Sequence, residues 1–223
     1  MTTRKVRTSI LISGRGSNMM SLVEASRQPG YPAEIVAVVS NRPDAEGLKW
    51  AAKQGIPAIG LDHKQFATRN AFEAKLHTTL MEHGTELICC AGFMRMLTGG
   101  FIDRWRDRQL NIHPSLLPSF AGLDTHERAI DQGVRIAGCT VHFMRLEMDS
   151  GPIVGQAAVP VLSGDTGEDL AARVLAAEHK LYPWALALVA SGRATVENEK
   201  IVIREDVNFA PVLFSPILPP GSK

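Results

Sequence analysis

The chain has 223 residues, and its 24 Lys and Arg residues against 23 Asp and Glu residues give a formal net charge of +1. That length suits one large domain or two small ones. Proteins that bind nucleic acid usually carry a basic surplus, which is missing here, so we expect no nucleic-acid partner. A small phosphorylated partner is compatible with this charge.

Three features of the sequence predict a cytoplasmic location. No apolar run approaches the roughly 20 residues of a membrane span, so we expect no membrane partner. The apolar run from Thr8 to Ile12 ends at glycines and is too short for a signal peptide. The three cysteines, Cys89, Cys90 and Cys139, form neither a disulfide framework nor a Cys-x-x-Cys site, so we expect reduced, mostly buried thiols.

Short apolar runs alternate with helix-like segments along the chain. The expected strands are Val6–Ile12, Glu34–Ser40, Ala58–Leu61, Leu87–Ala91, Gln109–Ile112, Gly138–Phe143 and Val154–Val159. The expected helices are Ser17–Ser26, Ala45–Gln54, Thr68–His83 and Thr125–Gln132, with Gly55, Gly84 and Gly133 closing three of them. This alternation predicts an α/β fold: one domain with a mostly parallel, twisted sheet of about seven strands and helices on both faces.

The C-terminal part departs from this alternation. The last two expected strands are joined only by the segment Met144–Pro152, which predicts an antiparallel edge. Thr166 and Asp169 approximate a capping box that would begin the final long helix, and Pro183 should kink or end it. We expect the domain to comprise residues 1–205, followed by an apolar, proline-rich tail at 206–223.

A glycine-containing loop, Ser13-Gly14-Arg15-Gly16-Ser17-Asn18, follows the first strand and leads into a helix. Glycines let backbone amides approach an anion, and a helix start offers unpaired N–H groups. A tight turn capped by Ser17 or Asn18 explains the same residues equally well. A dinucleotide site would need a third glycine where Met19 stands and an acid near Ser40, so a phosphate site without a dinucleotide fits better.

The run from Asn111 through His113-Pro114 to Pro118 places an amide and an imidazole two residues apart at a strand end. With a period of two, Asn111 and His113 share one face, and Pro114 stops the strand. Each could simply satisfy a hydrogen bond in the core, and Asp149 in its Gly-Pro turn could be a solvated surface acid. If that turn folds over the strand ends, Asp149 would hold His113 protonated beside a developing oxyanion.

These motifs together resemble the phosphoribosylglycinamide formyltransferases, a family of folate-dependent formyltransferases with a Rossmann-like fold. The resemblance covers about Val6 to Arg193 and rests on Gly14-x-Gly16-Ser17-Asn18, Ala91-Gly92-Phe93-Met94-Arg95, Asn111-Ile112-His113-Pro114-Ser115-Leu116-Leu117-Pro118, and Val141-His142-Phe143 followed by Asp149-x-Gly151. It implies transfer of the formyl group of 10-formyltetrahydrofolate to the amine of glycinamide ribonucleotide (GAR) in purine biosynthesis, without a metal.

The resemblance also implies roles for individual residues. Asn111 and His113 would stabilise a tetrahedral intermediate, and Asp149 would keep His113 protonated and relay a proton. Substrate would bind to Gly16, Ser17, Asn18 and Glu178, and folate to Arg69, Met94, Arg95, Met96, Leu97 and Arg145. The segment Ser119–Ala129 would be a mobile lid, and the protein a monomer or homodimer.

Two positions depart from the family pattern. Asp124 replaces a residue that is often His or Asn, and Leu175 replaces a Lys found in some relatives, so their help at the site is in doubt.

Three other functions are alternatives. Methionyl-tRNA formyltransferase carries a further C-terminal domain, and formyltetrahydrofolate hydrolase carries an extra domain ahead of its core. We expect no room for either domain here. A nonenzymatic folate or nucleotide binder would need none of Asn111, His113 and Asp149.

Overall fold

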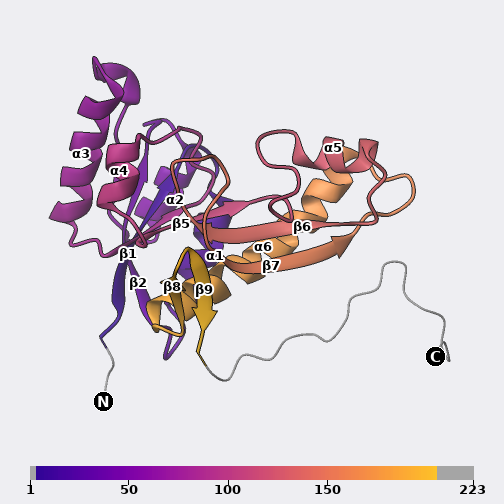
Figure 1. Ribbon diagram of the computed structural model, residues 1–223. Helices are drawn as coiled ribbons and strands as arrows, with labels where there is room; N and C mark the ends of the chain where they lie inside the picture. The colour runs from indigo at the N-terminus through magenta and orange to yellow at the C-terminus, as the bar shows by residue number, and fades with distance from the viewer. Residues whose placement is uncertain (1–3, 205–223) are drawn as a thin grey trace.

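The computed structural model describes residues 4–204 (Figure 1). Its main sheet has seven strands in the order β3-β2-β1-β4-β5-β6-β7. The strands are β1 Val6–Ile12, β2 Ala33–Ser40, β3 Ala58–Gly60, β4 Leu87–Cys90, β5 Gln109–His113, β6 Ile136–Phe143 and β7 Ile153–Pro160. The first five run parallel, whereas β6 is antiparallel to both β5 and β7. The predicted mostly parallel sheet with an antiparallel C-terminal edge is confirmed.

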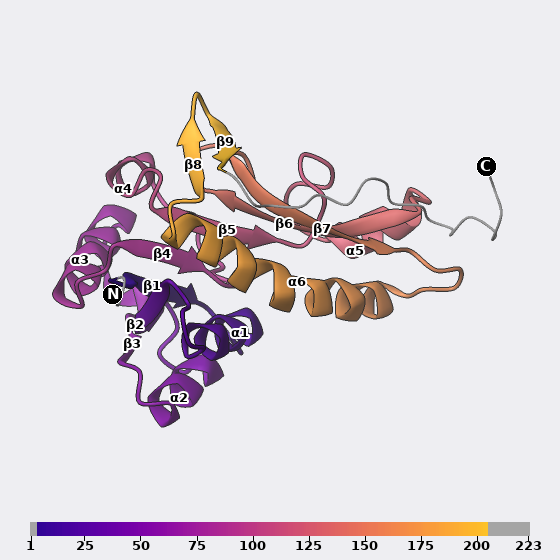
Figure 2. The same ribbon diagram turned by 90° about the horizontal axis from the view of Figure 1, so that it is seen from below.

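Helices cover both faces of the sheet, as predicted. Figures 1 and 2 show α1 (Ser17–Ser26), α2 (Glu46–Lys53) and α6 (Gly167–Ala190) on one face, and α3 (Arg69–Glu82) and α4 (Gly99–Arg104) on the other. The short helix α5 (Thr125–Asp131) packs against α6, and a 3-10 turn, η1, covers His63–Gln65. A separate hairpin of β8 (Ala194–Glu197) and β9 (Lys200–Ile203) follows α6.

The alternation of side chains along the central strands builds two cores. In β1, Ile10 and Ile12 join the core under α1, α2 and α6, whereas Leu11 joins the core under α3 and α4. In β4, Cys89 and Cys90 divide in the same way. Because successive strand residues point to opposite faces, an uninterrupted apolar run marks a strand that is buried on both sides.

Three features differ from the sequence predictions. Helix α4 was not predicted, because it has only six residues and begins with two glycines. The β8–β9 hairpin was not predicted either. Pro183 does not end α6, which runs on to Ala190. Tertiary contacts hold this stretch: the Tyr182 hydroxyl is fully buried and donates to Cys90 O at 3.0 Å, and the Tyr31 hydroxyl donates to Pro183 O at 2.6 Å. The predicted tail at 206–223 lies outside the described residues.

Candidate active site

A cavity of about 460 Å³ opens where β1, β2 and β4 end. It is lined by residues that follow these strands and by the 3-10 turn: Ser13, Gly14, Arg15, Gly16, Ser17, Asn18, Asn41, Arg42, His63, Ala91, Gly92 and Met94. The helices change faces at this point, since α1 and α2 cover one side and α3 the other (Figure 2). In open α/β sheets such a switch point, at the carboxyl ends of the strands, is where ligands bind.

The glycine loop forms one wall of this cavity and ends in α1. The N-cap of α1 is Gly16 with φ at 76°, a conformation that favours glycine. Within residues 4–204 no side chain caps α1, so the fold does not use Ser17 or Asn18 as caps. The first N–H groups of a helix have no intrahelical partner and carry the positive end of its dipole. The loop can therefore accept an anionic group.

Asn18 connects this loop to α6. Its Nδ2 donates to Glu178 Oε2 at 2.6 Å, and its buried Oδ1 has no hydrogen-bond partner among the described residues. Glu178 is only 6% exposed, and burial raises the pKa of its carboxyl against the lowering effect of Asn18. The structure thus brings Glu178 beside the glycine loop. The predicted contact of Glu178 with ribose hydroxyls stays a prediction.

Asn111 and His113 lie at the end of β5, two strands from β1. Their neighbours Leu110 and Ile112 point into the core under α6, so the two polar side chains share the opposite face. On the adjacent strand β6, His142 pairs with Asn111 in register. The strand end therefore carries a cluster of polar side chains on the same edge of the sheet as the cavity.

His113 contacts two acceptors with its two ring nitrogens. Nδ1 lies 3.4 Å from Asp149 Oδ1, and Nε2 lies 3.0 Å from the carbonyl oxygen of Phe120. Both side chains of this contact are nearly buried, 7% and 12% exposed. Asp149 Oδ2 also accepts from Gly122 N at 2.7 Å. A neutral imidazole has only one N–H, so the doubly protonated ring is the form that satisfies both acceptors.

His142 orients the amide of Asn111. Its Nδ1 lies 3.0 Å from Phe143 O and 3.1 Å from Ser150 O, so Nδ1 carries the proton and Nε2 is an acceptor. Asn111 Nδ2 lies 3.3 Å from that Nε2. Burial, the largest effect, lowers the pKa of His142, which keeps it neutral. Sequence reasoning assigned His142 no such role, because the antiparallel register that opposes it to Asn111 appears only in the fold.

The predicted folate residues after β4 differ in their exposure. Met94 and Met96 are 74% and 57% exposed, whereas Leu97 is buried in the core under α3 and α4. The guanidinium of Arg95 lies over the ring of Phe72, 5.1 Å from its centroid. Met94 also lines the cavity, and its N–H donates to Ser13 Oγ at 2.8 Å. The two exposed methionines thus offer apolar surface next to the strand ends.

Arg69 and Arg145, the other two predicted folate residues, lie in different surroundings. Arg69 is the exposed first residue of α3. Arg145 lies in the β6–β7 connection, where its guanidinium pairs with Asp107 and Glu199. Its guanidinium is therefore already engaged in two ion pairs. The folate contacts of both residues stay predictions.

The segment predicted as a lid, Ser119–Ala129, comprises an irregular stretch and the first part of α5. Its Phe120 and Gly122 supply the two backbone groups that contact His113 and Asp149. Asp124 precedes α5 with φ at 54° and does not cap it, and Leu175 lies on α6. The lid segment is thus in direct contact with the candidate catalytic groups.

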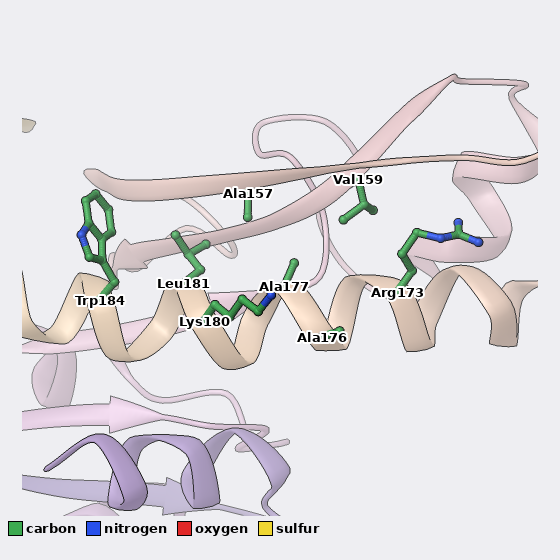
Figure 3. Close-up of a pocket in the computed structure, with 8 residues that line it drawn as sticks. All are labelled: Ala157, Val159, Arg173, Ala176, Ala177, Lys180, Leu181 and Trp184. Atoms are coloured by element: carbon green, nitrogen blue, oxygen red, sulfur yellow. The ribbon is translucent and has the colours of Figure 1, made fainter. Parts of the chain in front are cut away.

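A larger hollow lies elsewhere, between β7 and α6 (Figure 3). It measures about 620 Å³, and residues such as Ala157, Leu181 and Trp184 line it. None of the predicted site residues does. Volume alone therefore does not locate the site, which we assign from its convergent polar groups.

The described part of the chain offers neither a metal-binding cluster nor a membrane-spanning helix. Within residues 4–204, no group of three or more His, Cys, Asp or Glu side chains is placed to hold a metal ion. None of the helices that the structure describes combines the length and apolarity needed to cross a membrane. The three cysteines are buried free thiols.

Comparison with known proteins agrees with this fold and places the chain in a family. A family model described as formyl transferase matches residues 6–186, so the chain belongs to the formyl transferase family. Within that family it is similar to phosphoribosylglycinamide formyltransferase of Escherichia coli strain K12, with 40% identity over 184 residues, 82% of this chain and 87% of that protein. A crystal structure of glycinamide ribonucleotide transformylase 1 from Symbiobacterium toebii matches with a TM-score of 0.87 and 44% identity, covering 90% of this chain and 95% of that one.

The chain is also similar to part of a much longer protein. It is 50% identical over 194 residues to the trifunctional purine biosynthetic protein adenosine-3 of Gallus gallus. That match covers 87% of this chain but only 19% of the chicken protein. The chain thus spans about a fifth of the length of this relative and most of the length of the bacterial ones.

Proposed function

We propose that this chain transfers the formyl group of 10-formyltetrahydrofolate to the amine of GAR, a step of purine biosynthesis. The observation that carries the proposal is the pairing of His113 with Asp149, beside Asn111 and on the sheet edge that also holds the anion-accepting loop. Membership of the formyl transferase family and similarity to proteins named for this reaction support it. The residues act without a metal, and 10-formyltetrahydrofolate is a co-substrate.

The proposed reaction is a direct transfer. The amine of GAR attacks the formyl carbon, the new C–N bond forms, and negative charge develops on the former carbonyl oxygen. Asn111 donates to that oxygen through the Nδ2 hydrogen that His142 leaves free, and His113 stabilises it as a cation. The bond from carbon to the folate nitrogen then breaks, and the proton of the amine reaches the folate nitrogen through water and Asp149.

The lid takes part in this sequence because Phe120 O now occupies Nε2 of His113. For Nε2 to reach the formyl oxygen, the Phe120 carbonyl has to move away when the substrates bind. Gly122, with φ at 84°, gives the segment a residue that adopts such a backbone without strain. The lid then excludes water from the transfer.

At the other end of GAR, the loop Gly16, Ser17 and Asn18 binds the phosphate, and Glu178 accepts from the ribose hydroxyls. The pteridine binds to backbone groups near Met94 to Leu97 and Arg145, and Arg69 meets the carboxylate tail of the folate. The protein functions as a monomer or homodimer.

A spectroscopic assay of folate deformylation, run with and without GAR, tests the proposal. Transfer needs the acceptor, so we expect tetrahydrofolate to form only when GAR is present, together with formyl-GAR. Release of formate in the absence of GAR would show a hydrolase instead.

The residues have their own test. We expect His113→Ala and Asp149→Ala each to lower kcat by about 10²- to 10⁴-fold, while equilibrium binding of GAR largely survives. His83→Ala, at the far end of α3, is the matched control and should leave kcat unchanged. Near-normal kcat in either active-site variant would disprove the assigned mechanism.

A further inference from the structure

Asp149 lies in the connection between β6 and β7, which we call the Asp149 loop (residues 144–152). Its backbone is unusual, since Asp149 has φ at 51°. Within the loop, Ser150 N and Oγ donate to Glu147 O at 3.3 and 2.7 Å. These local bonds form a turn. Outside the loop, Met144 N donates to Gln109 O on β5 at 2.9 Å. Gly122 N also donates to Asp149, and His142 Nδ1 contacts Ser150 O. Charged side chains from other parts of the chain add to these bonds.

Arg145 forms the charged contacts between this loop and two other parts of the chain. Its side chain is only 10% exposed, Nε lies 2.6 Å from Glu199 Oε2, and Nη2 lies 2.7 Å from Asp107 Oδ1. Nη1 donates to Met144 O at 2.9 Å, which ties the guanidinium to its own loop. Burial lowers the pKa of Arg145, but the two carboxylates outweigh it and raise that pKa overall. The loop is thus fastened by one nearly buried cation to two other parts of the chain.

Glu199 belongs to the turn of the β8–β9 hairpin. Glu197 pairs with Lys200, so Asn198 and Glu199 form a two-residue turn, with φ at 50° and 59°. Two positive φ values define the type I′ turn, in which Gly is strongly preferred at the second position. Here a glutamate stands there at a conformational cost, and its carboxylate binds Arg145 and also Arg106, at 2.5 Å. The side chain therefore gains from contacts that a glycine could not make.

We propose that Glu199 is a positioning residue: through Arg145, the β8–β9 hairpin holds the loop that carries Asp149 in place against His113. The kinetic part of this inference rests on the proposed function, whereas the structural part does not. Glu199 touches neither His113 nor Asp149 and acts only through Arg145. The hairpin, which follows α6, thereby becomes part of the support of the site.

Three variants of the same turn test the proposal. Glu199→Gln removes the charge at nearly constant size. Glu199→Gly removes the side chain but creates Asn-Gly, the preferred type I′ turn, so the hairpin itself stays folded. Asn198→Gly, the matched control, relieves the turn equally and leaves the carboxylate in place.

The first measurement is hydrogen exchange of the backbone amides of residues 144–152, followed by mass spectrometry. We expect faster exchange in Glu199→Gln and Glu199→Gly, and unchanged exchange in Asn198→Gly. This readout needs no activity, so it tests the contact even if the proposed reaction is wrong. Unchanged exchange in both Glu199 variants would overturn the proposal.

The second measurement is kinetic. Because Glu199 is half exposed, we expect a modest loss, with kcat lowered about three- to tenfold and KM for GAR unchanged. Adding Glu199→Gly to Asp149→Asn should cost nothing further, since the carboxylate that the loop positions is already gone. Full additivity of the two changes would overturn the role through Asp149, and a wild type inactive with GAR would refute the proposed function instead.

Discussion

Ser17 is the first residue of α1, and its side chain does not cap the helix. Its neighbour Asn18 is engaged with Glu178, 2.6 Å away. The loop therefore leaves the backbone N–H groups of the helix start unpaired, which is the arrangement that binds phosphate in other helices. Binding there rests on the backbone, so only a substitution that places bulk or charge against the anion disturbs it.

We accordingly expect Ser17→Asp to weaken GAR binding by at least about tenfold, because its carboxylate repels the phosphate at close range. The same acid stabilises the start of a helix, so the free energy of unfolding should not fall. Titration calorimetry measures the affinity, and Ser21→Asp, on the same helix, is the control. Unchanged affinity for Ser17→Asp would mean that the loop is only the start of a helix.

Glu178 shows what one residue in a sequence can and cannot reveal. A single acidic residue in a long helix is expected to be solvated, and only the resemblance to a family predicted that Glu178 binds substrate. In the structure it is buried against Asn18, 160 positions away in sequence. Which face of α6 is covered depends on the packing of α1, and periodicity within α6 does not contain that information.

At the scale of elements, the connection between β6 and β7 has to turn sharply to bring Asp149 to His113. The ladder shifts register between Val141 and His142, and Gly151 follows with φ at 112°. A Cβ at Gly151 would lie 2.2 Å from Phe143 O, far inside contact distance. Glycine is thus required twice at this position, for its backbone conformation and for the approach of the neighbouring strand.

Gly151→Ala should therefore displace the Asp149 loop and lower both kcat and stability, the latter by about 1–3 kcal/mol. Gly164→Ala is the matched control, since its φ of 84° is also positive but its surroundings are open. Urea unfolding and steady-state kinetics give the two readouts. Equal losses of kcat and stability in the two glycine variants would show that the close approach of Gly151 to Phe143 O is unimportant.

Most elements could be predicted from the sequence because their pattern is local. Buried strands such as β1 and β4 read as apolar runs, and a glycine with positive φ follows helices such as α3, where Gly84 has φ at 63°. The β8–β9 hairpin escaped prediction because its turn, Asn198-Glu199, lacks the usual glycine. The contact between His113 and Asp149 could be predicted only on the condition that the turn with Asp149 folds over the strand ends. The sequence does not show where that loop folds.

At the scale of the whole molecule, the net charge is near neutral, but the pKa values of several histidines are shifted in the same direction. Burial is the main cause that lowers the pKa of His77, His126, His142 and His179 in the folded state. Burial raises the pKa of Glu178, which has the opposite effect on the pH dependence of stability. Because four histidine pKa values are lowered and one carboxyl pKa is raised, the folded protein binds fewer protons than the unfolded chain just below neutral pH.

The stability of the protein should therefore fall as the pH drops from 7 through 6.5. In that range the unfolded chain takes up protons on histidines that stay neutral when folded, so it binds more protons, and the free energy of unfolding decreases. His142 alone contributes at most about 1.4 kcal/mol per pH unit. Urea unfolding at pH 7.5, 6.5 and 5.5 measures the slope, and His142→Gln should flatten it, whatever its effect on absolute stability. A wild-type stability that stayed level or rose toward pH 5.5 would contradict the assignment of these histidines as neutral in the fold.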